Sequence, residues 1–396
     1  MSITESETGR RPRREGGGRR AGVSGRNPVP QLPRRKLRRL FPPMAIVSAD
    51  EIESIHHASL RVLSEIGMDF TLPEARDMLK KAGASVDGER VRFDPAMIEG
   101  LIASAPAEFT FHARNPDNDL RIGGDAITFG TVASPPNSAD MDNGRRTGNQ
   151  ADYRNFLRLG QYFNCIGFIA GYPVEPIDIH ASVRHLEALR DMVLLTDKPF
   201  HAYSLGTERI RDAIEIARLG RGISHEQLER EPSLFTIINT NSPLKLDTPM
   251  LRGILEMSAR NQIVCVTPFT LAGAMAPVTV AGALVEQNAE ALAGIAFTQL
   301  VRKGAPVIYG GFTSNVDMKS GAPAFGTPEY MKATIVGGQL ARRYKLPFRT
   351  SNTCAANAVD AQAAYESVFS LWGLTMGGGN LITVSYTHLR AHETRE

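Results

Sequence analysis

Aromatic and amide side chains stand at the carboxyl ends of a series of predicted strands, where they could bind a cation. The set comprises Phe129, Tyr172, His201, Tyr203, Asn239, Asn241, Phe269, Tyr309, Phe312 and Asn352. Aromatic faces attract a cation without hydrogen-bond donors, such as a quaternary ammonium group. Amides that end buried strands can fix a substrate carboxylate or a loop. The set predicts a substrate-binding site, although a ring at a strand end can equally belong to a packed core.

The residue patterns of metal-dependent and two-carboxylate hydrolases are missing from this set. It contains no paired carboxylates, no H-E-x-x-H motif and no cluster of three His, Asp or Glu ligands, so we predict no metal site and assign no catalytic residue. His388 and His392 have the i, i+4 spacing of a helical metal pair, but the glutamate of H-E-x-x-H is absent. The three cysteines are too widely spaced for a disulfide framework.

Short apolar runs alternate with amphipathic helices from Ala126 onward. The strand candidates are 126–131, 164–170, 200–204, 234–239, 263–267, 306–310, 347–351 and a last one that begins near Asn380. Helix starts are indicated at Thr207, at Asp247-Thr248 and at Thr327. Eight strands at roughly 30 to 45-residue spacing, each with its helix, favour an α/β fold of the (β/α)8 TIM-barrel type. A doubly wound sheet is disfavoured because the chain has neither G-x-G-x-x-G nor a phosphate loop.

A small α+β cap is predicted over residues 41–125, ahead of the barrel at 126–382. Ser48 and Glu51 form a capping box that starts a helix ending near Gly67. Two short helices follow, one from Pro73 to Ala82 and one that Asp94 caps. Strands at 109–113 and 120–122 are predicted to form a hairpin.

Residues 1–40 form an Arg/Gly-rich leader that we expect to be disordered. They hold twelve basic and three acidic residues, a net charge of +9, against 33 basic and 39 acidic residues, a net charge of −6, in the remainder. Such a segment has almost nothing to bury. No run of about 18 apolar residues predicts a membrane span, so a cytoplasmic protein is expected.

Several motifs together resemble the trimethylamine methyltransferase family of corrinoid-dependent methyltransferases. They are PFTLAGA at 268–274, PVT at 277–279, Gln299, GAPVIYG at 304–310, Asp317-Met318, GTPE at 326–329 and DAQA at 360–363. The resemblance runs from about Arg34 to Ile382. It implies a TIM barrel that binds a methylated amine and presents one N-methyl group to the Co(I) corrinoid of a separate small protein.

The resemblance also implies which amine is the better substrate. A quaternary ammonium already carries a neutral leaving amine, so the protein need only position and desolvate it. Methanogen members meet the harder case of a tertiary amine with pyrrolysine, which this sequence does not show. Glycine betaine is therefore preferred over trimethylamine, with Tyr203, Tyr309 and Phe312 expected around the methylammonium. No cofactor is expected on this chain itself, and a homo-oligomer is compatible with the family.

The carboxyl end departs from the family pattern. Residues 383–396 look non-native, and family members continue further, so we expect a barrel that is incomplete at its eighth βα unit, with a first strand left unpaired. Such a truncated chain could be inactive. Two rival functions remain: a barrel that binds methylamines without catalysis, and an RNA-associated protein that uses its Arg-rich arm. Nucleic acid is the less favoured partner because no aromatic residues are interleaved in the arm.

Overall fold

A computed structural model describes residues 30–140, 142–356, 358 and 360–384. Its contacts divide the chain into two units, Met1–Pro33 and Arg34–Glu396. All the helices and strands named below belong to the second unit.

Parallel strands in the second unit form a TIM barrel, as the sequence predicted, but the expectation of an unpaired first strand is wrong because the strands close into a ring. They are β7 (Ala126–Gly130), β10 (Ile166–Phe168), β11 (Phe200–His201), β12 (Leu234–Asn239), β14 (Ile263–Thr267), β16 (Val307–Gly310), β19 (Phe348–Asn352) and β20 (Leu381–Val384). Neighbours in this order pair in parallel, β10 joins β11 through a bridge between Ile169 and Phe200, and β20 returns to β7. The first strand thus has partners on both sides.

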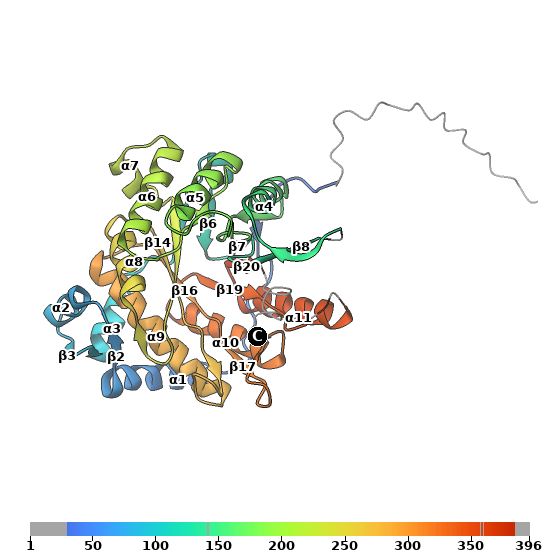
Figure 1. The fold of residues 1–396 in the computed structure, drawn as a ribbon. Helices are drawn as coiled ribbons and strands as arrows, with labels where there is room; N and C mark the ends of the chain where they lie inside the picture. The colour runs from blue at the N-terminus through green and yellow to red at the C-terminus, as the bar shows by residue number, and fades with distance from the viewer. Residues whose placement is uncertain (1–29, 141, 357, 359, 385–396) are drawn as a thin grey trace, which may run out of the picture. The chain divides into compact units, whose positions relative to one another are not determined.

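A layer of helices surrounds these strands (Figure 1). The helices are α4 (Gln150–Tyr162), α5 (Arg184–Leu195), α6 (Thr207–Arg221), α7 (His225–Arg230), α8 (Thr248–Ala259), α9 (Val280–Val301), α10 (Pro328–Arg343) and α11 (Ala361–Gly377). Asp247 and Thr327 cap α8 and α10 through their side chains, as predicted. Thr207 does not cap α6, because it is the first helical residue and Gly206 occupies the cap position.

The predicted cap helices are present and pack against the barrel. They are α1 (Ala49–Arg61), which continues as a π-helix over Val62–Ile66, α2 (Pro73–Lys81) and α3 (Pro95–Ile102), with β2 (Met68–Phe70), β3 (Ser85–Asp87) and β4 (Arg90–Arg92) between them. Both halves of the capping box form between Ser48 and Glu51. α1 and α3 lie against α9, and β2 pairs with β13 (Lys245–Leu246) in the loop after β12. The cap therefore contacts a loop at the carboxyl end of the barrel.

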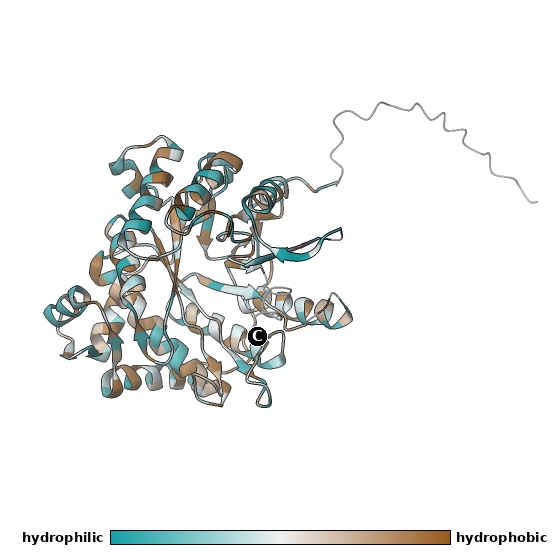
Figure 2. Ribbon diagram, in the orientation of Figure 1, coloured by the Kyte–Doolittle hydropathy of each residue, from teal (hydrophilic) through white to brown (hydrophobic). Residues whose placement is uncertain are grey.

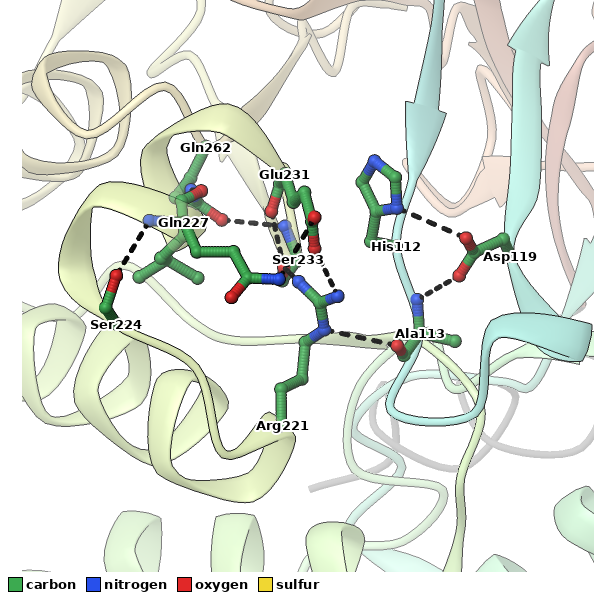
Figure 3. A network of polar contacts seen from close by, with 10 residues as sticks. His112, Ala113, Asp119, Arg221, Ser224, Gln227, Glu231, Ser233 and Gln262 are labelled. Carbon is green, nitrogen blue, oxygen red and sulfur yellow. Dashed lines mark hydrogen bonds and ion pairs between the residues drawn. The ribbon is translucent and has the colours of Figure 1, made fainter.

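The predicted hairpin closes the amino-terminal end of the barrel. Its strands β5 (Glu108–Phe111) and β6 (Leu120–Gly123) pair, with the 3-10 helix Pro116–Asn118 between them, and place Phe111, Leu120 and Ile122 against the apolar barrel interior. Arg221 of α6 donates to the Ala113 carbonyl and to Ser233 and Glu231, while Asp119 accepts from His112 and Ala113 (Figure 3). This network ties the hairpin to the start of β12, so a ligand must enter from the opposite end.

Short strands that the sequence did not predict extend the loops at the carboxyl end. β8 (Asn137–Asp140) and β9 (Gly144–Thr147) form a hairpin, and β15 (Leu271–Ala272), β17 (Ser314–Val316) and β18 (Pro323–Ala324) form a small sheet. β8 is coloured as hydrophilic in Figure 2, whereas the barrel strand β14 is apolar. Such short polar strands lack the apolar signal on which strand prediction depends.

The predicted boundaries of the leader and the tail need correction. Residues 1–29 and 385–396 lie outside the described residues. β1 (Leu37–Arg38) pairs with β7, so regular structure begins before the predicted limit at residue 40. Thr383 and Val384 belong to β20, so the predicted non-native tail begins too early at residue 383. The eighth strand is therefore present, and a helix after it would fall on residues 385–396, outside the described part.

Two amino-terminal deletions should have different effects on stability. Removal of residues 1–29 should leave the melting temperature unchanged, because their composition cannot support a core. Removal of residues 1–40 also deletes β1 and Arg39, whose backbone and side chain donate to the carbonyls of Asp125 and Gly124. We expect that deletion to lower the free energy of unfolding by about 1 to 2 kcal/mol. Thermal melts of both proteins test this, and an equal loss in both would contradict it.

Candidate active site

Polar side chains face the interior of the barrel at its carboxyl end. Alternation along β12 turns Asn239 to the same side as the interior residues Phe235 and Ile237. Asn239 pairs in register with Thr267, and Gly310 pairs with Arg349. A side chain at Gly310 would place its Cβ 2.1 Å from Thr267 Oγ1, so only glycine fits there. The interior is thus polar at the end where ligands can enter.

His201 of β11 is a buried, neutral imidazole. Its side chain is packed inside the barrel and its Nε2 accepts a hydrogen bond of 3.0 Å from the Ile237 amide. Burial, with a smaller contribution from the charge of Arg349, lowers the pKa of His201 to about 3. Because Nε2 is an acceptor, the proton resides on Nδ1, and this buried atom has no hydrogen-bond partner. His201 therefore has an unused donor.

Arg349 of β19 is a buried cation in the same interior. The residue is 6% exposed, and its Nη2 donates to Thr383 Oγ1 at 2.6 Å. Thr383 in turn lies 2.7 Å from Ser351 Oγ. Nε of Arg349 has no partner, and no carboxylate of the described residues forms an ion pair with the guanidinium. The sequence analysis missed this residue, although an arginine within a short strand of a barrel is the signal that could have identified it.

Two predicted site residues, Tyr172 and Tyr203, form a continuous aromatic group with His201. The ring of Tyr203 lies edge-on to His201 at 4.6 Å between centroids and to Tyr172 at 4.8 Å. The Tyr203 hydroxyl accepts from the Tyr172 amide at 3.1 Å and is hydrogen-bonded to Ser134. Burial raises the pKa of Tyr203 far above its usual value, so the hydroxyl stays neutral. The two tyrosine rings are held in fixed positions beside the imidazole.

A pocket of about 290 Å³ borders this aromatic group. Tyr172 and Tyr203 form part of its wall, with Glu175, Arg184 and Arg209 among the other lining residues. Burial raises the pKa of Glu175, and Arg184 Nη1 is 3.9 Å from its carboxylate. The pocket combines aromatic faces with charges of both signs.

A second aromatic group contains the predicted residues Phe269 and Phe312. Their rings stack at 5.1 Å, and Phe312 also contacts Phe325 and Tyr330 edge-on. Phe269 and Phe312 lie in the loops after β14 and β16, Phe325 lies in the segment that leads into α10, and Tyr330 lies in the first turn of α10. Phe269 remains partly exposed. The structure therefore brings the predicted aromatic residues together in two groups rather than one.

Four predicted residues lie away from the interior. Tyr309 is fully buried between β16 and the helix layer, where its hydroxyl donates to Asn288 of α9 at 3.1 Å. The prediction that Tyr309 faces the barrel mouth is wrong, because alternation turns it to the outer face of the strand. Phe129 also points outward. A Cβ on its neighbour Gly130 would meet the interior ring of Phe168, so position 130 faces the interior and position 129 faces the opposite side.

The other two are asparagines that hold helices in place. Asn241 is exposed, and its side chain pairs with Asp247, the residue that caps α8. Asn352 donates to Ser367 of α11 at 2.9 Å. Their contacts fix helix positions and do not place the amides among the interior groups.

Neither a metal-binding cluster nor a helix suited to crossing a membrane occurs among the described residues. These residues contain no group of three or more His, Cys, Asp or Glu side chains arranged to hold a metal ion. None of their helices combines the length and the apolarity that a membrane crossing requires.

Comparisons with known proteins give consistent matches. The family model described as trimethylamine methyltransferase (MTTB) matches residues 12–389. A glycine betaine methyltransferase of Desulfitobacterium hafniense strain Y51 is 36% identical over 87% of this chain and 72% of its own length. A trimethylamine methyltransferase MttB of D. hafniense strain DSM 10664 / DCB-2 is 28% identical over 86% of this chain and 69% of its length.

Two further matches are a relative named for proline betaine and a solved structure with a similar fold. A proline betaine:corrinoid methyltransferase of Eubacterium limosum is 28% identical over 85% of this chain and 70% of its length. Among solved structures, an MtmB hydroxylamine complex superposes with a TM-score of 0.56, at 11% identity, over 87% of this chain and 78% of that one. The structural match supports the fold alone.

Proposed function

Because this chain belongs to the trimethylamine methyltransferase family, we propose that it moves an N-methyl group from a quaternary amine to a corrinoid. Glycine betaine is the preferred substrate, and the corrinoid is carried by a separate small protein. The observation that carries this proposal is the 36% identity to a glycine betaine methyltransferase, which extends over most of both chains. The relative named for proline betaine and corrinoid supports the same class of reaction.

The chemistry places few demands on acid or base groups of the chain. A reduced corrinoid supplies a Co(I) nucleophile that accepts the methyl group, and the quaternary nitrogen leaves as a neutral amine. The chain must hold the cation, exclude water and aim one methyl group outward. Neutral buried groups such as Tyr203 and His201 fit these tasks, since neither changes its charge near neutral pH.

We assign the quaternary ammonium to the two aromatic groups. Tyr172 and Tyr203 present rings on one side, and Phe269 and Phe312 stack in the loops after β14 and β16. A cation over an aromatic face gains about 0.5 to 2 kcal/mol per ring. Tyr309 drops out of this assignment because its ring is enclosed by the helix layer.

Methyl transfer to free cobalamin tests the proposed function. Incubation of the chain with Co(I)-cobalamin and glycine betaine should give methylcobalamin, which is followed by its absorbance, at a rate proportional to enzyme. Replacing Phe312 with leucine should weaken betaine use by several-fold up to about thirtyfold, whereas Tyr309→Phe, which keeps the outward ring, should not change it. The proposal fails if no betaine-dependent methylcobalamin forms at high enzyme concentration.

The same experiment separates the rival function of a barrel that only binds methylamines. Such a barrel would bind glycine betaine and leave cobalamin unmethylated. We also propose a cytoplasmic location, because Co(I) persists only under reducing conditions and Cys165 and Cys265 are free thiols.

A further inference from the structure

Two hydrogen-bond donors inside the barrel have no acceptor. They are Nε of Arg349 and Nδ1 of His201, both buried and both without a partner. The two residues are 6% and 1% exposed. Each side chain is fixed at another atom, Arg349 through Thr383 and His201 through the Ile237 amide. The unused donors are therefore held in place rather than free to rotate toward other acceptors.

A purely structural role does not account for this arrangement. A buried cation costs several kcal/mol unless it is paired and hydrogen-bonded, yet the one protein contact described for the Arg349 side chain is with a neutral hydroxyl. The half-buried arginine Arg342 shows the structural alternative, since its two terminal nitrogens donate to the carbonyls of Gly377 and Met44. A missing anion would explain why Arg349 is kept in the interior.

The two donors act on the same region of the barrel. The charge of Arg349 is near enough to affect two interior side chains. It adds to the lowering that burial causes in the pKa of His201, and it partly offsets the rise that burial causes in the pKa of Cys265. Gly310, the register partner of Arg349, contributes no side chain there, and Asn239 at the end of β12 is exposed to solvent. The region is thus reached from the carboxyl end of the barrel.

We propose that Arg349 and His201 bind the carboxylate of the substrate, which makes the substrate an N-methylated amino acid rather than a simple methylamine. This inference rests on the proposed function and specifies its substrate class. The ring of Tyr203 lies 4.6 Å from His201, so a carboxylate at His201 places a nearby quaternary nitrogen next to the tyrosine pair. In glycine betaine one methylene separates the two charged groups, which matches this short spacing.

Binding measured by calorimetry, without cobalamin, tests the subsite with two ligands that share the trimethylammonium group. Glycine betaine carries the carboxylate, and choline carries a neutral hydroxyl in its place. The wild-type chain should prefer betaine. Arg349→Met should weaken betaine binding about 10- to 100-fold and leave choline within about threefold, because a charge-assisted hydrogen bond is lost for betaine alone. His201→Phe should reduce the same preference by a smaller factor.

Melting temperature gives a second readout, because a structural role for Arg349 predicts the opposite change. Arg349→Met removes a buried charge without a counter-ion, so the free protein should melt at the same or a higher temperature. The control Arg342→Met should melt at a lower temperature and keep the wild-type preference for betaine over choline.

The outcomes separate this inference from the proposed function. If Arg349→Met binds betaine as well as the wild type does, or if it lowers the melting temperature and weakens both ligands equally, the carboxylate subsite is refuted while methyl transfer can stand. If Arg349→Met abolishes the preference for betaine but the wild-type chain never methylates cobalamin, the subsite holds and the catalytic proposal fails. Absence of any betaine binding to the wild-type chain overturns both.

Discussion

Replacing Glu290 with alanine should destabilise the barrel by about 3 to 5 kcal/mol. The carboxylate of Glu290 is fully buried on α9 and accepts from the Leu244 amide at 2.6 Å, from Ser242 Oγ at 2.7 Å and from Thr240. These donors belong to the loop after β12. The alanine variant would leave all three without this acceptor, the buried hydroxyl of Thr240 among them, which costs more than the loss of the hydrogen bonds alone.

Glu286, one turn earlier on α9, provides a matched control. Burial and the charge of Glu290 raise the pKa of Glu286 to about 7, and its Oε1 has no partner. Because the folded-state pKa lies above the ordinary value, this group disfavours the folded state as pH rises through that interval. At pH 8, Glu286→Ala should therefore be neutral or stabilising. Urea denaturation of both variants makes the comparison. Similar losses in the free energy of unfolding at the two positions would show that the hydrogen bonds from Glu290 to the loop after β12 are not the cause.

Gly338→Ala should lower the free energy of unfolding by at least about 2 kcal/mol. α10 and α11 approach so closely at this position that a Cβ on Gly338 would lie 2.0 Å from the carbonyl oxygen of Gly377. The obstacle is backbone, so the two helices would have to move apart. α11 also carries Ser367, the partner of Asn352 at the end of β19, so the shift would reach the barrel.

The adjacent Gly337 offers a control within the same helix. A Cβ there would first meet the Phe348 ring at 3.3 Å, which needs only a small adjustment. Alanine gains up to about 1 kcal/mol of helix propensity over glycine, so Gly337→Ala should be near neutral. Circular dichroism melts measure both variants. Equal melting temperatures for Gly337→Ala and Gly338→Ala would contradict the close approach.

Local features of the sequence were sufficient to predict most of the elements and the barrel. The capping box at Ser48, the cap residues Asp247 and Thr327 and the eight apolar runs each act within a few residues, so they can be identified before the fold is known. The repeated spacing then limits the architecture, because parallel strands need a crossover helix between them. Short polar strands such as β8 were missed, since they have no apolar pattern.

The direction in which each strand residue points was decided by the tertiary structure alone. β16 is buried on both faces, as barrel strands are, so its sequence shows no polar and apolar alternation to mark the interior side. The sequence therefore predicts Tyr309 at the mouth, although its hydroxyl contacts α9. The same reason hid Arg349, because it is the strand order of the closed barrel, with β19 opposite β11, that brings it to the same interior as His201 rather than any neighbour in sequence. Composition at the strand ends predicted an aromatic site for a cation, and only closure of the barrel revealed the buried donors beside it.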